Sequence, residues 1–443
     1  MSEQLQSAES EPLPIHLPDE WEMAQVAASS LRPAGEDWPE ELARALNQPG
    51  TGLPLERLLA ARRDERVVLV VEDLTRHSPL DRILPILLRE IRHAGVEDSR
   101  LEIVFATGMH PPLTADQARA KLGPGCDGIA WRCNPWQDAA SYDDVGHVGR
   151  VGISVDRGVL RAGLRILVSS VSPHLQAGFG GGYKMLLPGC ASLETIRELH
   201  RQGIGRSMRQ LVGIDAERNA MRQVIDDGGE LIDAAHGKTF VVQYILDEAD
   251  QPAAISTGEP LPAQRMLAKH AAVSCGVIVP SPGDVLITDA SPRDFDLWQS
   301  FKGIANTLWA ARPGGVIICL TRCPGGMNNV KPPRWPLSPA VTRRAVQLLG
   351  PTNLANLVMR LAPHLAGDAA FFIRMATQIL HRNWIYMVSP KLADDGAAFP
   401  GIRIFATLDD ALAAARLQLG PGRQRVVHFP AGGITYPVPQ RAT

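Results

Sequence analysis

The chain has 443 residues, more than one ordinary hydrophobic core supports, so we expect two domains. Its 45 basic and 47 acidic residues are interspersed and give a net charge of −2, and no basic stripe indicates a nucleic-acid partner. The longest apolar runs are strand-sized rather than membrane-spanning, and six cysteines in so long a chain indicate free thiols, so we expect a cytoplasmic protein.

Strand-like and helix-like runs alternate along most of the chain, which is typical of α/β domains with mainly parallel sheets. In the first half the patterns predict strands at 66–72, 101–106 and 164–169, and helices at 83–93 and 192–203. Thr114 and Gln117 have the spacing of a capping box and predict another helix start. In the second half they predict strands at 276–280, 285–288, 316–320, 385–388 and 425–429, and helices at 296–311, 339–349 and 371–381.

The domain organisation follows from these two series. Residues 1–20 are acidic and polar, lack the apolar core of a signal peptide, and are expected to form a flexible leader. A polar segment at 256–264 separates the series, so we place the domain boundary at 265–275. The expected domains are an N-terminal one at 21–270 and a C-terminal one at 275–443.

The most informative stretch runs from His174 to His200 and contains four glycines within five positions, followed by Lys184. Glycine has no Cβ, so such positions allow a close approach to the backbone. A phosphate-binding Walker loop is not indicated, because Tyr183 precedes the lysine and Met185 follows it. A partly desolvated lysine amine is nucleophilic, so Lys184 is a candidate for covalent attachment of a cofactor.

Three polar loops follow predicted strands at their carboxyl ends, where open α/β sheets bind ligands. Asp73, Thr75 and Arg76 follow the first strand, His110 follows the second, and His174 follows the third. We expect these side chains to surround one pocket. Structural roles remain open for each: the aspartate and threonine could cap a turn, the arginine could be a surface charge, and a single histidine is often structural.

The histidines do not form a conventional metal site. His110, His174 and His200 lack the short spacings of zinc ligands, and no thiolate or carboxylate set completes a site. His200 also lies near the end of a predicted helix, where the helix dipole alone favours a histidine. If a metal is bound, most of its ligands must come from a group other than the protein.

As an ordered set, the motifs resemble the lactate racemase family, nickel-pincer enzymes that racemise or epimerise 2-hydroxy acids. The resemblance covers about residues 65–305, and any one motif alone would be a weak signal. The matching motifs are Asp73-x-Thr75-Arg76, Gly108-x-His110, Pro173-His174, Gly181-Gly182-x-Lys184 with Pro188-Gly189, His200, and Gln299-x-x-Lys302.

The resemblance implies a nickel-pincer nucleotide, a cofactor derived from nicotinic acid mononucleotide whose two sulfur-containing arms hold nickel. In the family, the lysine at Lys184 forms a thioamide to one arm, and the histidine at His200 is the fourth nickel ligand. Cofactor-maturation enzymes are then expected partners. The other positions that match the cofactor-binding motifs are Asp73, Thr75, Arg76, Gly181 and Gly182.

The implied reaction inverts the C2 centre of a 2-hydroxy acid by reversible hydride transfer to the cofactor. Such a reaction needs an acid/base on each face of the substrate, and His110 and His174 match these roles. Gln299 and Lys302 would hold the substrate carboxylate as the C-terminal domain closes over the cleft between the domains.

The chain also departs from the family pattern. Some members have a substrate-contacting arginine between the aspartate and the threonine, where this chain has Leu74, and members often have proline directly after Arg76, where this chain has His77. The region of Arg374 and Met375 replaces a pocket-lining aromatic. We therefore expect a larger 2-hydroxy acid than lactate as the substrate: aromatic, dicarboxylic or sugar-derived.

Two other functions remain open. A carrier of the nickel nucleotide would keep Lys184 and His200 but would not need both His110 and His174. An enzyme of the same fold could also carry out other hydride chemistry, such as a dehydration or a single redox step. We favour the racemase because both histidines are present together with the Gln299-x-x-Lys302 motif.

Overall fold

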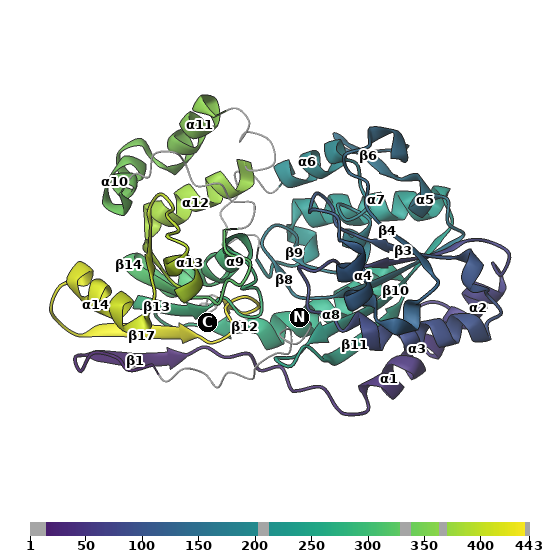
Figure 1. The fold of residues 1–443 in the computed structure, drawn as a ribbon, viewed down its shortest axis with the longest axis horizontal. Coiled ribbons are helices and arrows are strands. Elements are labelled where there is room, and N and C mark those ends of the chain that lie inside the picture. Colours follow the sequence, from purple (N-terminus) through teal and green to yellow (C-terminus); the bar gives the residue numbers. More distant parts are fainter. Residues whose placement is uncertain (1–14, 203–211, 328–337, 363–369, 439–443) are drawn as a thin grey trace.

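A computed structural model describes residues 15–202, 212–327, 338–362 and 370–438 of the chain. This part forms two lobes, each built on a six-stranded sheet with helices on both faces (Figure 1). The predicted α/β class with mainly parallel sheets is confirmed. Residues 1–14 of the expected leader lie outside the described residues.

The first sheet has the strand order β11-β10-β7-β2-β3-β4, and its β10–β11 pair is antiparallel while the other pairs are parallel. Its strands are β2 (Val67–Val71), β3 (Leu101–Phe105), β4 (Ala130–Cys133), β7 (Leu164–Ser170), β10 (Lys238–Leu246) and β11 (Pro252–Gly258). Strand β2 is buried on both faces because its alternating side chains enter two different apolar cores.

One of these cores is formed with α1 (Trp38–Asn47), α2 (Leu55–Ala60) and α3 (Leu80–His93). The other is formed with α6 (Leu193–Gln202) and α7 (Ala220–Ala235), and it also contains the turn that carries Lys184. The predicted capping box is confirmed at α4 (Ala115–Leu122): the Gln117 amide donates to Thr114 Oγ1 at 3.3 Å, and the Thr114 amide donates to Gln117 Oε1 at 3.0 Å.

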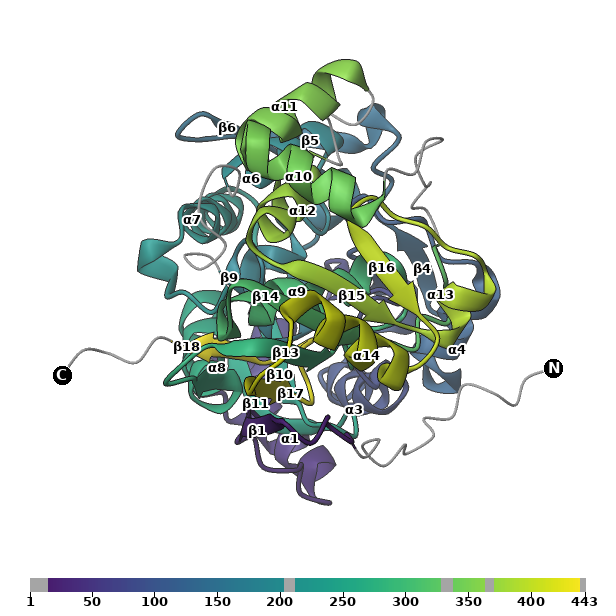
Figure 2. The same ribbon diagram turned by 90° about the vertical axis from the view of Figure 1, so that its left-hand side faces the viewer.

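The second sheet has the strand order β1-β17-β13-β14-β15-β16, and all its pairs are parallel. Helix α14 (Leu408–Leu419) packs on one face, and α9 (Leu297–Thr307) and α12 (Ala370–Arg382) pack on the other (Figure 2). Helices α10 (Pro339–Leu349) and α11 (Pro351–Leu361) lie beside α12. The strands are β1 (Trp21–Val26), β13 (Gly283–Asp289), β14 (Ala311–Leu320), β15 (Trp384–Val388), β16 (Ile402–Phe405) and β17 (Gln424–Phe429).

Smaller elements complete the two lobes. Helix α5 (Arg157–Leu160) follows a hairpin of the first lobe, and α13 (Pro390–Asp394) lies between β15 and β16. Three two-stranded ribbons are β5 (Tyr142–Val148) with β6 (Val151–Asp156), β8 (Pro173–His174) with β9 (Gly178–Phe179), and β12 (Gly276–Ile278) with β18 (Tyr436–Val438).

Strand β1 joins the lobe that is otherwise formed by the second half of the chain. It pairs in parallel with β17, so that Trp21 lies opposite Gln424 (Figure 1). This differs from the expectation that the N-terminal domain begins at residue 21, because a local apolar pattern does not show which sheet a strand joins.

The expected boundary at 265–275 falls inside a continuous helix, α8 (Pro260–Cys275). This helix packs on β10 and β11, and its Leu267 and Ala271 share one apolar core with Leu286 of the second sheet. The connection between the lobes is therefore a packed helix rather than a polar linker. In the described part of the chain, no helix is both long enough and apolar enough to cross a membrane.

Gly229 tests the packing that positions the Lys184 turn. It lies on α7, and a Cβ at this position would be 2.0 Å from the Tyr183 ring. Alanine in a helix is ordinarily more stable than glycine by about 0.5–1 kcal/mol. Here we expect Gly229→Ala to lower the free energy of unfolding by about 1–3 kcal/mol, because it overpacks a filled core.

Urea denaturation measures this change. Asp227→Ala, an exposed position on the same helix, is the control and should change the free energy of unfolding by less than about 0.5 kcal/mol. A Gly229→Ala protein as stable as the wild type would contradict the close contact between α7 and Tyr183.

Candidate active site

The carboxyl ends of strands from both sheets meet between the lobes. Arg293 follows β13 of the second sheet, and it donates from Nη1 to the Thr75 carbonyl oxygen at 3.2 Å and from Nη2 to Ser172 Oγ at 3.4 Å. Thr75 and Ser172 follow β2 and β7 of the first sheet. The edge that binds ligands in open α/β sheets is thus shared by the two lobes.

His110 is hydrogen-bonded to Asp73. Its Nδ1 lies 2.5 Å from Asp73 Oδ2, and Asp73 Oδ1 accepts from the Thr75 amide at 2.9 Å and from Thr75 Oγ1 at 2.5 Å. Burial alone would raise the pKa of the Asp73 carboxyl, but His110, Thr75 and Arg76 together hold this pKa well below its ordinary value. The ionised carboxylate keeps a proton on Nδ1 of His110, so Nε2 of the neutral ring carries the lone pair.

His174 has the opposite arrangement. Its Nδ1 accepts from the backbone amides of Gln176 at 3.2 Å and Ala177 at 3.1 Å, so the proton of the neutral ring lies on Nε2. Burial, together with the positive charges of Lys184 and Arg76, lowers the pKa of His174 well below its ordinary value. The ring is therefore neutral near pH 7, and its Nε2–H is a hydrogen-bond donor.

Lys184 lies on a short 3₁₀ turn at Gly182–Met185. Burial, together with the nearby charges of Arg76 and Arg222, lowers the pKa of its amine to about 7, although Glu72 and Asp73 act in the other direction. A large fraction of this amine is neutral at physiological pH. It is therefore nucleophilic, in contrast to an exposed lysine.

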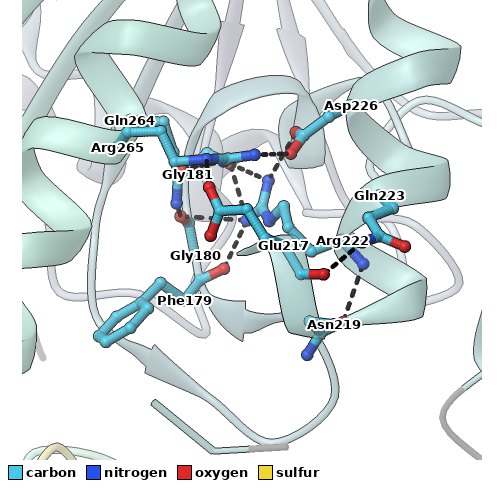
Figure 3. A network of polar contacts seen from close by, with 10 residues as sticks. All are labelled: Phe179, Gly180, Gly181, Glu217, Asn219, Arg222, Gln223, Asp226, Gln264 and Arg265. Carbon is cyan, nitrogen blue, oxygen red and sulfur yellow. Dashed lines mark hydrogen bonds and ion pairs between the residues drawn. The ribbon is translucent and has the colours of Figure 1, made fainter. Parts of the chain in front are cut away.

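The backbone that leads into this turn is held by Arg222 of α7 (Figure 3). The buried guanidinium donates to the carbonyl oxygens of residues 179–181, and its Nη1 lies 3.3 Å from Asp226 Oδ1. Arg265 pairs with the other oxygen of Asp226 at 2.6 Å, and Gln264 donates to the Gly180 carbonyl oxygen at 3.0 Å. This network fixes the position from which the Lys184 side chain starts.

Gly181 and Gly182 are required by the fold of the loop itself. Both have left-handed backbone conformations, with φ of 76° and 63°. A Cβ at Gly181 would lie 2.7 Å from Val171 and 3.0 Å from the Gln243 amide. These contacts come from the protein's own side chains, whereas the sequence had led us to expect room for a ligand.

Gln299 and Lys302 come from α9 of the second lobe. Asp296 caps this helix by accepting from the Gln299 amide at 2.7 Å, and Lys302 Nζ donates to Gln299 Oε1. Burial and the charges of Arg76, Arg293 and Lys184 lower the pKa of Lys302 well below its ordinary value. Lys302 therefore lies close enough to the first lobe for the charges of Arg76 and Lys184 to act on it.

The remaining predicted residues lie around this region. His200 is on α6, and its carbonyl oxygen accepts from Gln176 Nε2 at 3.3 Å, two residues from His174. Leu74 is 41% exposed in the loop after β2. Met375 is buried in the core of the second lobe and Arg374 donates to Asn356 of α11, so these contacts do not support their predicted place in the pocket.

Within the described ranges, no group of three or more His, Cys, Asp or Glu side chains could hold a metal ion. The six cysteines are free thiols.

Residues 9–211 match the model of the lactate racemase N-terminal domain. Lactate racemase from Thermoanaerobacterium thermosaccharolyticum is 26% identical over 298 residues, which are 66% of this chain and 67% of that protein. Lactate racemase from Lactiplantibacillus plantarum is 27% identical over 292 residues, 63% of this chain and 65% of that protein. The chain thus resembles the lactate racemase family.

The fold of this family extends over nearly the whole chain. The lactate racemase apoprotein structure from T. thermosaccharolyticum matches with a TM-score of 0.78 at 21% identity, covering 96% of this chain and 97% of that one. A Thermotoga maritima protein matches with a TM-score of 0.61 at 15% identity, covering 91% of this chain and 98% of that one. The second lobe therefore keeps the family fold although it lies outside the matched N-terminal domain.

Two buried arginines of the candidate site, Arg293 and Arg222, were not predicted from the sequence. Arg293 follows β13, and the same rule about carboxyl ends of strands would have found it in the second sheet. Arg222 lies on the apolar face of α7 between Met221 and Ile225, where a charged residue is unusual. That anomaly was the only signal of its role in the sequence.

The pKa of Lys184 is open to a direct test. The rate of carbamylation of Lys184 by cyanate should rise mainly between about pH 6 and 8, because its amine titrates near 7. Arg76→Gln removes a charge that lowers this pKa, so the Lys184 profile should move to higher pH. Peptide mass mapping follows the Lys184 peptide, and a rate that rises mainly at about pH 10.4, the ordinary pKa of a lysine, would show that Lys184 is not perturbed.

Proposed function

We propose that this protein is a 2-hydroxy acid racemase or epimerase that uses a nickel-pincer nucleotide attached to Lys184. Similarity to this family supports the reaction class, since two relatives are named lactate racemase. The observation that carries the proposal is the opposite hydrogen bonding of the two histidines: Nδ1 of His110 faces a carboxylate, while Nδ1 of His174 faces two amides. One imidazole is ready to accept a proton and the other to donate a hydrogen bond.

The residues present fit this cofactor. Lys184 offers an amine with a pKa of about 7, as the formation of an amide-type bond requires, and the described side chains hold no protein-only metal site. His200 would supply the single protein ligand to nickel, and imidazole together with sulfur is compatible with this ion. The nucleotide would be held by Asp73, Thr75 and Arg76 together with the Gly181–Gly182 backbone.

The chemistry that the bound cofactor would supply is reversible acceptance of the hydride from C2 of the substrate. The protein handles the hydroxyl proton. Nε2 of His110 accepts it, and the ionised Asp73 carboxylate stabilises the resulting imidazolium, because its Oδ2 lies 2.5 Å from Nδ1. Lys302 and Gln299 would bind the substrate carboxylate from the second lobe, which closes the cleft.

His174 donates from Nε2–H to the substrate oxygen in the arrangement described above. Nε2 of His174 already carries the proton of the neutral ring, so it can accept another proton only after this one moves to Nδ1. Two amide N–H groups donate to Nδ1 and oppose that move. Acid/base work by His174 therefore requires release of Nδ1 from the amides of Gln176 and Ala177. The two directions of the reaction thus start from chemically different histidines.

The substrate is expected to be larger or less polar in its side chain than lactate. Leu74 presents apolar surface in the loop beside Asp73, and each additional buried methylene is worth about 0.8 kcal/mol. Phenyllactate, malate, 2-hydroxyglutarate and gluconate, assayed beside lactate, cover the aromatic, dicarboxylic and sugar-derived alternatives. Lactate as clearly the best substrate would contradict the role given to Leu74.

Cofactor attachment is tested by intact mass after coexpression with the cofactor-maturation enzymes. The wild-type mass should increase by one cofactor, and Lys184→Ala should remove the whole increment. His200→Ala should keep the organic increment but lose nickel, because it removes a ligand to the metal and not the covalent bond. Lys391→Ala, an exposed lysine, should behave as the wild type. An unchanged increment in Lys184→Ala would refute the attachment site.

The acid/base roles are tested by a chirality assay on protein loaded with cofactor. His110→Ala and His174→Ala should each lower kcat about 10²–10⁴-fold without loss of cofactor, the usual range for general acid–base catalysis. Asp73→Asn should also lower kcat, because an amide no longer fixes the proton on Nδ1 of His110. Exposed His381→Ala is the control.

Two outcomes would contradict this assignment. A histidine variant with near-normal rates in both directions would show that this histidine is structural. Loaded wild-type protein that inverts none of the acids tested would favour the carrier function, or other hydride chemistry, over the racemase.

A further inference from the structure

Arg293 is a buried cation that the proposed mechanism does not use. Only 6% of it is exposed. The loop on which it lies is held at its next residues, because Asp294 pairs with Arg322 at 2.6 Å and Asp296 caps α9. The backbone is therefore fixed in an orientation that directs Arg293 to the other lobe, where it meets Thr75 and Ser172.

The hydrogen bonds of Arg293 leave much of its guanidinium available. A guanidinium has five N–H groups, and Arg293 donates one to the Thr75 carbonyl and one to the Ser172 hydroxyl. Among the described residues, no carboxylate lies within ion-pair distance of it. Both of its partners are neutral, so the charge itself has no direct partner in the described part of the protein.

The acids whose charges act on Arg293 already have other partners. Glu72 accepts from the hydroxyls of Ser78 and Ser170, and Asp73 accepts from Thr75 and binds His110. Asp250 binds His77 at 3.2 Å. None of these carboxylates forms an ion pair with the guanidinium.

Other cations surround Arg293. Burial and the charge of Arg76 lower the pKa of Arg293 to about 10 although Glu72, Asp250 and Asp73 oppose this change. Lys302, in turn, has its pKa lowered by both Arg76 and Arg293. Burial is the largest of these effects on Arg293, and burying a charge without a partner is costly. An anion between these three side chains would supply such a partner.

The geometry brings two guanidinium groups to one acceptor. Nη1 of Arg76 and Nη1 of Arg293 both donate to the Thr75 carbonyl oxygen, at 3.1 Å and 3.2 Å. The loop after β2 presents the apolar Leu74 beside the Thr75 carbonyl to which Arg293 binds. Arg293 therefore adds a positive charge from the second lobe to that of Arg76 in this loop.

We propose that Arg293 binds an oxyanion group of the ligand, a carboxylate or a phosphate, in the junction between the lobes, together with Lys302 and Arg76. Arg293 would thereby be a specificity-determining residue that this chain carries on its second domain. The anion is either the acid group of the substrate or the phosphate of the nucleotide. Which of these two anions binds depends on the proposed function, whereas the existence of an anion site at Arg293 does not.

Calorimetric titration of the full chain, purified without cofactor, tests the site independently of turnover. The probes are oxalate and inorganic phosphate. Arg293→Gln should weaken binding of at least one probe about 10–100-fold, because a hydrogen-bonded ion pair is worth that much. Arg293→Lys keeps the charge and should lose less. Arg416→Gln removes an exposed arginine on α14 and should bind as the wild type.

The outcomes separate an anion site from a structural contact. Arg293→Gln that melts earlier but binds both probes as the wild type would show that Arg293 only joins the lobes, and the proposal would be wrong. A wild-type protein that binds neither probe would overturn it as well. If Arg293→Gln does not fold, Arg293→Lys is the decisive variant. Its side chain is shorter, so a direct contact should be weakened. An affinity equal to that of the wild type for both probes would therefore contradict a direct contact.

The loaded enzyme identifies the anion. A rise in KM with unchanged cofactor mass in Arg293→Gln assigns the site to the substrate carboxylate. A loss of cofactor mass assigns it to the phosphate. Absence of racemase activity in the loaded wild type would refute the proposed function while leaving the calorimetric result on Arg293 intact.

Discussion

The site depends on a surplus of buried positive charge where the two sheets meet. Arg76 and Lys184 come from the first lobe, and Arg293 and Lys302 come from the second, while Glu72 and Asp73 are engaged elsewhere. Burying these charges without anionic partners is costly, and this cost opposes the contact between the lobes. The opposing contributions are the apolar core that continues across the junction and, once present, an anionic ligand.

The same charges make the imidazoles of His174 and His110 chemically different. His174 lies among cations and accepts two amides at Nδ1, so it is neutral and donates from Nε2. His110 is paired with an ionised carboxylate on the opposite side of its ring from Nε2. Two histidines could not divide the work of a base and a donor if their surroundings were alike.

Much of the fold and part of the site could be predicted from local sequence. The strands β2, β3 and β7 are short apolar runs, and the rule that ligands bind at carboxyl ends of strands selected Asp73, His110 and His174. What the sequence could not show is which distant groups meet. The contact of Arg222 with the carbonyl oxygens of residues 179–181 joins segments about forty positions apart, and Arg293 acts across two sheets.

The position of β1 has a consequence for how the protein acquires its structure. Trp21 pairs with Gln424, and β17 lies between β1 and β13, so the first strand has no partner until almost the entire chain has been made. Contacts between such distant residues form slowly because a very long loop must close first. During synthesis the first lobe can assemble on its own β2–β11 framework, while residues 21–26 remain an exposed edge segment. The second lobe, and with it the complete site, is therefore the last part of the molecule to form.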